Sequence, residues 1–253
     1  MSHFCEKIRW TLDLCNLPYV EVPMTPVFHL YSAWRMGGRG RTSLPILKVV
    51  ARQSPTDFIQ DSTRILSWLD RELGPCDLMP RCSLSEEVSA IEDRFDRIGQ
   101  DVSRLLYAHA FQHDDKVLRF WGSSATPWQR QCLKASLPLV RWVFRRRLGL
   151  SRNGLRRADH QLQQALAWLD GRLSDGRTFL VGSRLTVADV AAASLLAPLA
   201  CPEQHPVFSQ ADFKRYMLPG SATWLNDRPA LRWVRRMYAE HRNALTEGAA
   251  ATA

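Results

Sequence analysis

Two adjacent polar residues, Asp61 and Ser62, stand directly before a run of apolar side chains with helical spacing. At the start of a helix the first backbone N–H groups lack partners, and the helix dipole makes this end partly positive. Such an end can hold a carboxylate. The same two residues would also form an ordinary helix cap. Capping and ligand binding are compatible, so the pattern leaves both roles open.

The candidate metal ligands do not form a set. His109 and His113 are four residues apart, as two ligands on one helix face would be, but no third ligand lies in register. The cysteines are Cys5, Cys15, Cys76, Cys82, Cys132 and Cys201. Their spacing is not that of a metal site, and we interpret them as reduced thiols. The N-terminal residues contain no apolar signal region. We therefore expect no metal and a cytoplasmic protein.

The net charge of +9 could indicate a nucleic acid or a membrane surface as partner. The densest basic stretch contains Arg141, Arg145, Arg146, Arg147, Arg156 and Arg157. These residues lie within helical patterns, so a solvated helix face is the simpler interpretation. No nucleic-acid-binding motif accompanies them, and we expect no nucleic-acid partner.

Four tryptophans could line an apolar substrate pocket, although we expect most of them in a helical core. They are Trp121, Trp128, Trp142 and Trp168. The segment Val140–Arg147 could dock on an anionic membrane, but a protein-facing helix with a basic outer edge is the simpler interpretation. No apolar run approaches the roughly 18 residues of a membrane span, so we expect no stable membrane insertion.

Residues 1–75 predict the order helix, strand, loop, strand, strand, helix. Phe4, Ile8, Leu12 and Cys15 share one helix face, and 19–22 alternates as a short strand does. A glycine-rich loop over 37–43 precedes a strand over 44–50 and a brief strand at 58–59. The helix that Asp61 and Ser62 open carries Ile65, Leu66, Leu69 and Leu73 on its apolar face. This pattern predicts a small α/β domain over 1–75.

Everything after a linker at 75–80 has helical periodicity, which predicts an all-helical domain over 83–253. Capping boxes at 83–86 and 186–189 start two helices, and the second helix is apolar enough to be buried centrally. Thr126 and Pro127 begin another helix, which Pro138 should kink. Leucines over 155–173 define the next helix, residues 198–226 look irregular, and a last helix begins near Pro229.

Four segments resemble the cytosolic glutathione transferase superfamily. They are Ser2–Trp10, Thr42–Leu47, Asp61–Leu66 and Phe179–Asp189. The resemblance implies a thioredoxin-like N-terminal domain followed by an all-α helical-bundle domain, and a homodimer. The family has a strand before the first segment, whereas this sequence begins at Met1. We therefore expect a sheet without its first strand, in which residues 19–22 lose a neighbour.

The resemblance implies a glutathione site around Pro45. Pro45 stands at the family's cis-proline position, where a cis bond turns the backbone of Leu44 outward to pair with the cysteinyl part of glutathione. The alternative is an ordinary strand-initiating proline. The resemblance further implies that Ser62 binds the γ-glutamyl carboxylate and that Asp61 binds the ammonium group.

Ser2 matches the family's catalytic position, where a hydroxyl donates to the glutathione sulfur and favours its thiolate. Cys5 stands at the second position of the related Cys-x-x-Cys motif, but Ser2 replaces the first cysteine, so we expect a packing thiol. The leading hypothesis is an enzyme that conjugates glutathione, as co-substrate, to a small apolar electrophile. The alternative is a non-catalytic binding protein of the same fold.

Overall fold

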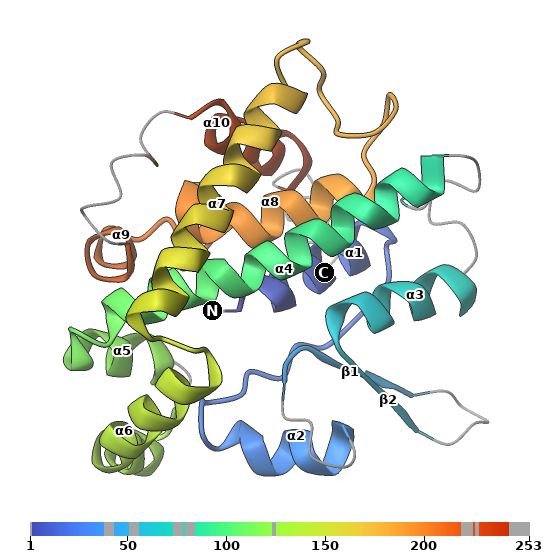
Figure 1. Ribbon diagram of the computed structural model, residues 1–253. Coiled ribbons are helices and arrows are strands. Elements are labelled where there is room, and N and C mark those ends of the chain that lie inside the picture. The colour runs from blue at the N-terminus through green and yellow to red at the C-terminus, as the bar shows by residue number, and fades with distance from the viewer. Residues whose placement is uncertain are drawn as a thin grey trace.

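The computed structural model describes residues 2–37, 43–50, 56–72, 78, 84–122, 125–218, 225 and 228–242. A small sheet lies to one side of a predominantly helical body (Figure 1). The first part of the chain contributes α1 (His3–Leu14), α2 (His29–Gly37), β1 (Ile46–Val49), β2 (Asp57–Gln60) and α3 (Ser62–Glu72). The predicted α/β organisation of this part, thioredoxin-like in type, is thereby confirmed.

The two described strands pair antiparallel, with Ile46 opposite Gln60 and Val49 opposite Asp57. The prediction of a strand at 19–22 is wrong, because this segment is a loop in which Val20 and Val22 are largely exposed. Alternating side chains form a strand only where a neighbour accepts their backbone hydrogen bonds. Among the described residues, the sheet pairs β1 with β2 and offers 19–22 no such neighbour.

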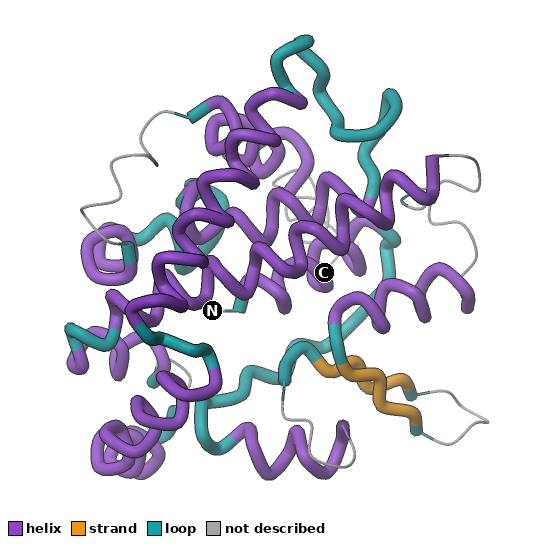
Figure 2. Tube along the Cα trace, viewed as in Figure 1, coloured by secondary structure: helices purple, strands orange, loops and turns teal. Residues whose placement is uncertain are grey.

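The described residues from 84 onward are predominantly helical, as predicted (Figure 2). They form α4 (Leu84–Ala110), α5 (Asp114–Trp121), α6 (Pro127–Arg147), α7 (Arg152–Arg172), α8 (Val187–Ala200), α9 (Ala211–Met217), α10 (Pro229–Met237) and a π-helical turn (Tyr238–Arg242). The cap predicted at Thr126 is present, and Gln129 completes it as a capping box. The expectation that 198–226 is irregular is wrong in part, because α9 lies within it. None of the described helices is long and apolar enough to cross a bilayer.

Helix α8 forms the centre of the core, and every one of its residues is buried. The Asp189 carboxylate fixes its start by accepting hydrogen bonds from the backbone N–H groups of Leu180 (2.7 Å) and Thr186 (2.8 Å). Helix α1 packs against α8, and the fully buried Trp10 ring lies 4.8 Å from the Tyr238 ring. The first helix of the chain is therefore built into the helical core.

The cysteines need one correction. Cys5, Cys132 and Cys201 are free thiols, but Cys15 is disulfide-bonded. Cys76 and Cys82 lie outside the described residues, as do the glycine-rich loop at 38–42 and the Ser83 cap.

Candidate functional site

The peptide bond between Leu44 and Pro45 is cis, which confirms the prediction. Pro45 is buried, and its carbonyl accepts the N–H of Asp61 at 3.2 Å. Among the described residues, the N–H and C=O of Leu44 have no hydrogen-bond partner. The cis bond thus leaves a short length of main chain ready to pair with an extended peptide.

Asp61 and Ser62 form the start of α3, as predicted. Oδ1 of Asp61 accepts the backbone N–H groups of Thr63 (3.1 Å) and Arg64 (3.4 Å), so the carboxylate caps the helix. Within the described part of the chain, the N–H of Ser62 and Oδ2 of Asp61 make no hydrogen bond. One donor and one anionic acceptor therefore remain available at the same helix end.

Ser2 caps α1, with its Oγ accepting the N–H of Cys5 at 3.4 Å. This bond uses a lone pair of the hydroxyl and leaves its proton free to donate elsewhere. Burial raises the pKa of the Cys5 thiol, which keeps it protonated and unreactive. This agrees with the expected packing role of Cys5.

A buried ion cluster lies beside Ser62. Lys7 has no exposed surface, and its Nζ lies 2.5 Å from Oε1 of Glu92 and 2.5 Å from Oδ1 of Asp96. The hydroxyl of Thr63 lies 3.0 Å and 2.9 Å from the same two carboxylates, and that of Ser62 lies 3.5 Å from Asp96. Burial raises the pKa of Glu92, while the Lys7 ammonium opposes the rise. The cluster thus ties α1 and α3 to α4.

His3 makes a second attachment to α4. Its Nε2 lies 2.9 Å from the carbonyl oxygen of Gly99, and burial lowers the pKa of His3 to about 4. At neutral pH the ring is therefore uncharged and donates from Nε2. A Cβ atom on Gly99 would lie 2.9 Å from Cζ of Phe4, so glycine permits this close approach of α1.

Helix α4 sets the spacing between the two ends of the site. Glu92, Asp96 and Gly99 are separated by four and three residues, which places them on one helix face. Ser62 contacts Asp96 and His3 contacts Gly99, positions about 4.5 Å apart along the helix axis. Ser2 and Ser62 are therefore held on the same side of α4.

Sequence reasoning missed Lys7, Glu92 and Asp96. Glu92 and Asp96 are spaced by four residues beside the apolar face of α4, and Lys7 adjoins the apolar face of α1. A charged residue next to the apolar face of a helix can point into the core, and this position was the available signal for all three residues. Their pairing joins residues 85 and 89 positions apart, which no local pattern specifies.

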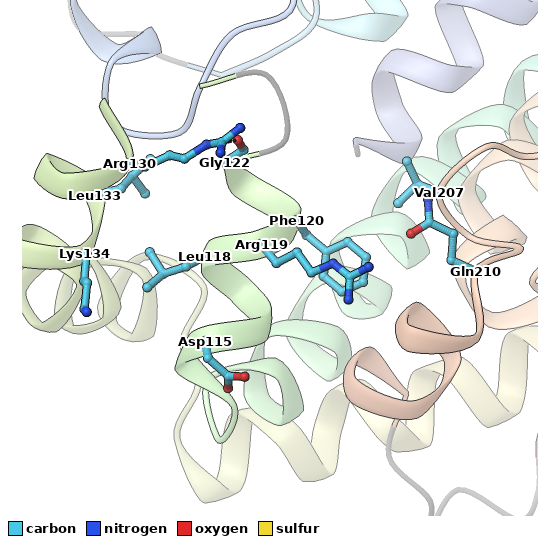
Figure 3. A pocket seen from close by; sticks show the side chains of 10 residues that line it. All are labelled: Asp115, Leu118, Arg119, Phe120, Gly122, Arg130, Leu133, Lys134, Val207 and Gln210. Carbon is cyan, nitrogen blue, oxygen red and sulfur yellow. Dashed lines mark hydrogen bonds between the residues drawn. The ribbon is translucent and has the colours of Figure 1, made fainter. Parts of the chain in front are cut away.

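A pocket of about 560 Å³ lies elsewhere, between α5, α6 and the segment that contains Val207 and Gln210 (Figure 3). Apolar Leu118 and Leu133 and the charged side chains of Arg119 and Lys134 contribute to its wall. None of the site residues described above lines it. The expectation that most of the four tryptophans are core is also wrong, because Trp121 is buried and Trp168 half-buried, but Trp128 and Trp142 are exposed.

Comparison with known proteins decides the family. Residues 1–72 match the family model for the glutathione S-transferase N-terminal domain, and residues 152–236 match that for the C-terminal domain. The chain belongs to the glutathione transferase superfamily. No curated protein gives a significant match to the sequence.

Solved glutathione transferases share the fold at low sequence identity. A glutathione S-transferase from Methylobacterium radiotolerans, in complex with glutathione sulfonate, is 21% identical with a TM-score of 0.57, covering 94% of this chain and 87% of that one. Glutathione transferase GSTFuA3 from Phanerochaete chrysosporium is 16% identical with a TM-score of 0.58 (92% and 87% covered). A glutathione S-transferase from Ceriporiopsis subvermispora, in complex with glutathione, is 14% identical with a TM-score of 0.57 (94% and 89% covered).

Proposed function

We propose that this protein is a glutathione transferase that joins the thiolate of glutathione, its co-substrate, to a small apolar electrophile. The proposal rests above all on the free main-chain edge at the cis Leu44–Pro45 bond, which lies next to the helix end at Ser62. Two structural neighbours were crystallised with glutathione or its sulfonate. We further propose a cytoplasmic homodimer with domains over 1–75 and 83–253.

Each part of the tripeptide has a suitable partner in this arrangement. The N–H and C=O of Leu44 would pair with the cysteinyl backbone, and the N–H and hydroxyl of Ser62 would bind the γ-glutamyl carboxylate. Oδ2 of Asp61 would accept the ammonium group. We add Asp96 as a second carboxylate near that ammonium, because it lies 3.5 Å from the Ser62 hydroxyl and is 22% exposed.

The chemistry would occur at the start of α1. The Ser2 hydroxyl would donate a hydrogen bond to the glutathione sulfur and stabilise its thiolate. The positive end of the α1 dipole would stabilise the same thiolate charge. The thiol proton would pass to water, and the thiolate would then attack an electrophilic carbon to form a carbon–sulfur bond. At an aryl halide the halide would leave with its electron pair, and at an activated alkene the π electron pair would move to the neighbouring carbon, which takes up a proton. Most of the rate enhancement would come from thiolate stabilisation and orientation.

Calorimetric titration with glutathione tests the binding site. Ser62→Ala removes a hydrogen bond to a charged group, so we expect at least about tenfold weaker binding. Ser67→Ala, an exposed position on the same helix, is the matched control and should bind as wild type. If wild-type protein shows no heat of binding at millimolar glutathione, the proposed site is wrong.

The catalytic role of Ser2 needs a separate measurement. Ser2→Ala should leave glutathione affinity nearly unchanged, lower the conjugation rate and raise the pKa of the bound thiol, read from thiolate absorbance against pH. A rate and a thiol pKa equal to those of wild type would remove Ser2 from the mechanism.

One observation favours the alternative of a non-catalytic binding protein with the glutathione transferase fold. His3, the ionisable side chain next to Ser2, is neutral and bonded to Gly99, so it adds no positive charge for a thiolate. Glutathione binding without turnover of a panel of aryl halides and activated alkenes would support this alternative.

A further inference from the structure

Exposed apolar side chains gather on two helices. In the part of the chain that the structure describes, ten large apolar side chains are exposed, and six of them lie on α2 and α6. They are Leu30, Tyr31, Trp34, Trp128, Leu139 and Trp142. Figure 1 shows α2 and α6 together at the bottom of the molecule, and the rings of Phe28 and Trp128 lie 5.4 Å apart at the N-terminal ends of the two helices. These six residues form what we call the aromatic face.

On α6 this face is directed away from the protein. Trp128, Leu139 and Trp142 fall within about 60° of one another around the helix axis, given 3.6 residues per turn. The buried residues Leu133 and Leu137 lie on the opposite side. Helix α6 therefore has two apolar stripes, one used by the core and one left outside, where Trp128 is 64% and Trp142 55% exposed.

The charged side chains that α2 and α6 themselves carry have one sign. Neither α2 nor α6 contains an aspartate or glutamate, whereas α6 carries six lysines and arginines. Arg141 is paired with Asp114 of α5, and Arg130 donates to the Gly122 carbonyl. Lys134, Arg145 and Arg146 make no ion pair with any described residue.

The basic surface continues from α6 onto α7. Arg152, Arg156 and Arg157 are exposed within the first turns of α7, a few residues after the end of α6. Arg146 lies 5.0 Å from the centre of the Trp142 ring. A guanidinium next to an exposed indole combines a cation with an amphipathic ring, as residues at a lipid–water boundary do.

We propose that the aromatic face of α2 and α6 docks reversibly on an anionic phospholipid bilayer. The indole and leucine side chains would enter the headgroup region, and the lysine and arginine side chains would bind lipid phosphates and carboxylates. This is peripheral binding without a membrane span. It is independent of the proposed reaction, since no residue of the glutathione site takes part.

Vesicle co-sedimentation of the full chain tests the proposal. The protein should bind vesicles of phosphatidylcholine with about 30% phosphatidylglycerol, and binding should fall steeply with added salt. Removing two charges with Arg145→Gln and Arg146→Gln should weaken binding about 30-fold. Trp142→Ser should weaken it about tenfold through loss of buried apolar surface. Equal binding to pure phosphatidylcholine would overturn the charge argument.

Matched controls separate this face from the general basicity of the protein. Arg71→Gln with Arg236→Gln removes two exposed arginines from α3 and α10, and Val22→Ser removes an exposed apolar side chain elsewhere. Both control variants should bind vesicles as wild type does. If they lose as much binding as the α6 variants, the aromatic face is not the docking site.

Two other occupants would contradict the proposal. If the aromatic face instead covers a second copy, light scattering will show a dimer that Trp142→Ser converts to monomers, and vesicles will not bind. If it holds nucleic acid, an oligonucleotide will bind in a manner that needs Trp142 and Arg146, again without vesicle binding.

Discussion

Helices α4 and α6 use their polar and apolar side chains in opposite ways. Helix α4 carries six aspartates and glutamates, and it directs Glu92 and Asp96 inward to a buried lysine. Helix α6 carries none, and it exposes Trp128, Leu139 and Trp142 to solvent. The difference shows that burial on its own identifies neither helix's role. In α4 the informative feature is a buried charge, and in α6 it is an exposed apolar stripe.

Removing the charge at Lys7 should have the largest effect. Lys7→Met leaves the buried Glu92 and the half-buried Asp96 without their cation, which we expect to cost about 3–5 kcal/mol in the free energy of unfolding. The same substitution on α6, Lys134→Met, removes an exposed charge and should change stability by no more than about 0.5 kcal/mol. Urea denaturation of both variants measures the contrast.

A second substitution distinguishes charge from packing at the same place. Adding Glu92→Gln to Lys7→Met removes one of the two uncompensated carboxylates, so part of the lost stability should return. If the double variant is as unstable as the sum of the single ones, Lys7 acts through packing and the ion cluster is not what joins α1 to α4.

Acid should weaken the contact between α1 and α4, whereas α6 itself carries no aspartate, glutamate or histidine that could titrate. Burial lowers the pKa of His3 from 6.5 to about 4, so the unfolded chain binds a proton more readily than the folded one. The stabilisation is complete above pH 6.5 and is lost as the pH falls towards 4, by up to about 3 kcal/mol. Thermal unfolding across this pH range should show the loss.

Histidine variants test whether His3 causes this loss of stability at low pH. His3→Gln keeps a side-chain N–H for the Gly99 carbonyl but cannot titrate, so its stability should vary less with pH. His160→Gln, at an exposed position on α7, should leave the wild-type slope. Some slope should persist in His3→Gln, because burial also lowers the pKa of His205, to about 3. A His3→Gln profile identical to that of wild type contradicts the assignment.

The close approach of α1 to α4 predicts a smaller effect. Gly99→Ala would place a Cβ 2.9 Å from Cζ of Phe4 and 3.0 Å from Cδ2 of Leu195, which should cost about 1–3 kcal/mol. Gly171→Ala on α7 meets no described atom within 4 Å and should add about 0.5–1 kcal/mol of stability through helix propensity. We expect Gly99→Ala to lower the melting temperature and Gly171→Ala to raise it. If both substitutions change it in the same direction, α1 can move away from α4.

Features fixed by neighbouring residues were predictable from the sequence. The caps at Ser2, Thr126 and Thr186 depend on residues within three positions of each other, and all three are present. The cis bond at Pro45 was predictable because X-Pro bonds alone make cis inexpensive and the surrounding residues resembled a known family.

Features that depend on residues far away in the sequence were not predictable from it. The alternation at 19–22 is typical of a strand, but strand formation depends on a pairing partner that the alternation does not specify. The expectation of buried tryptophans was wrong for Trp128 and Trp142, because which side of α6 is covered depends on where α5 packs. The Lys7 cluster required knowledge of which helix faces α1.

The smallest effect should come from the outward stripe itself. Leu139 is 63% exposed on α6, so Leu139→Gln should change the free energy of unfolding by no more than about 0.5 kcal/mol. Leu137→Gln, two positions away on the buried side, should be severely destabilising and serves as the contrast. Urea denaturation at two protein concentrations is the measurement. If Leu139→Gln costs more than about 1 kcal/mol, and costs more at the higher concentration, another copy of the chain covers this stripe in solution, because stability shared between copies depends on their concentration.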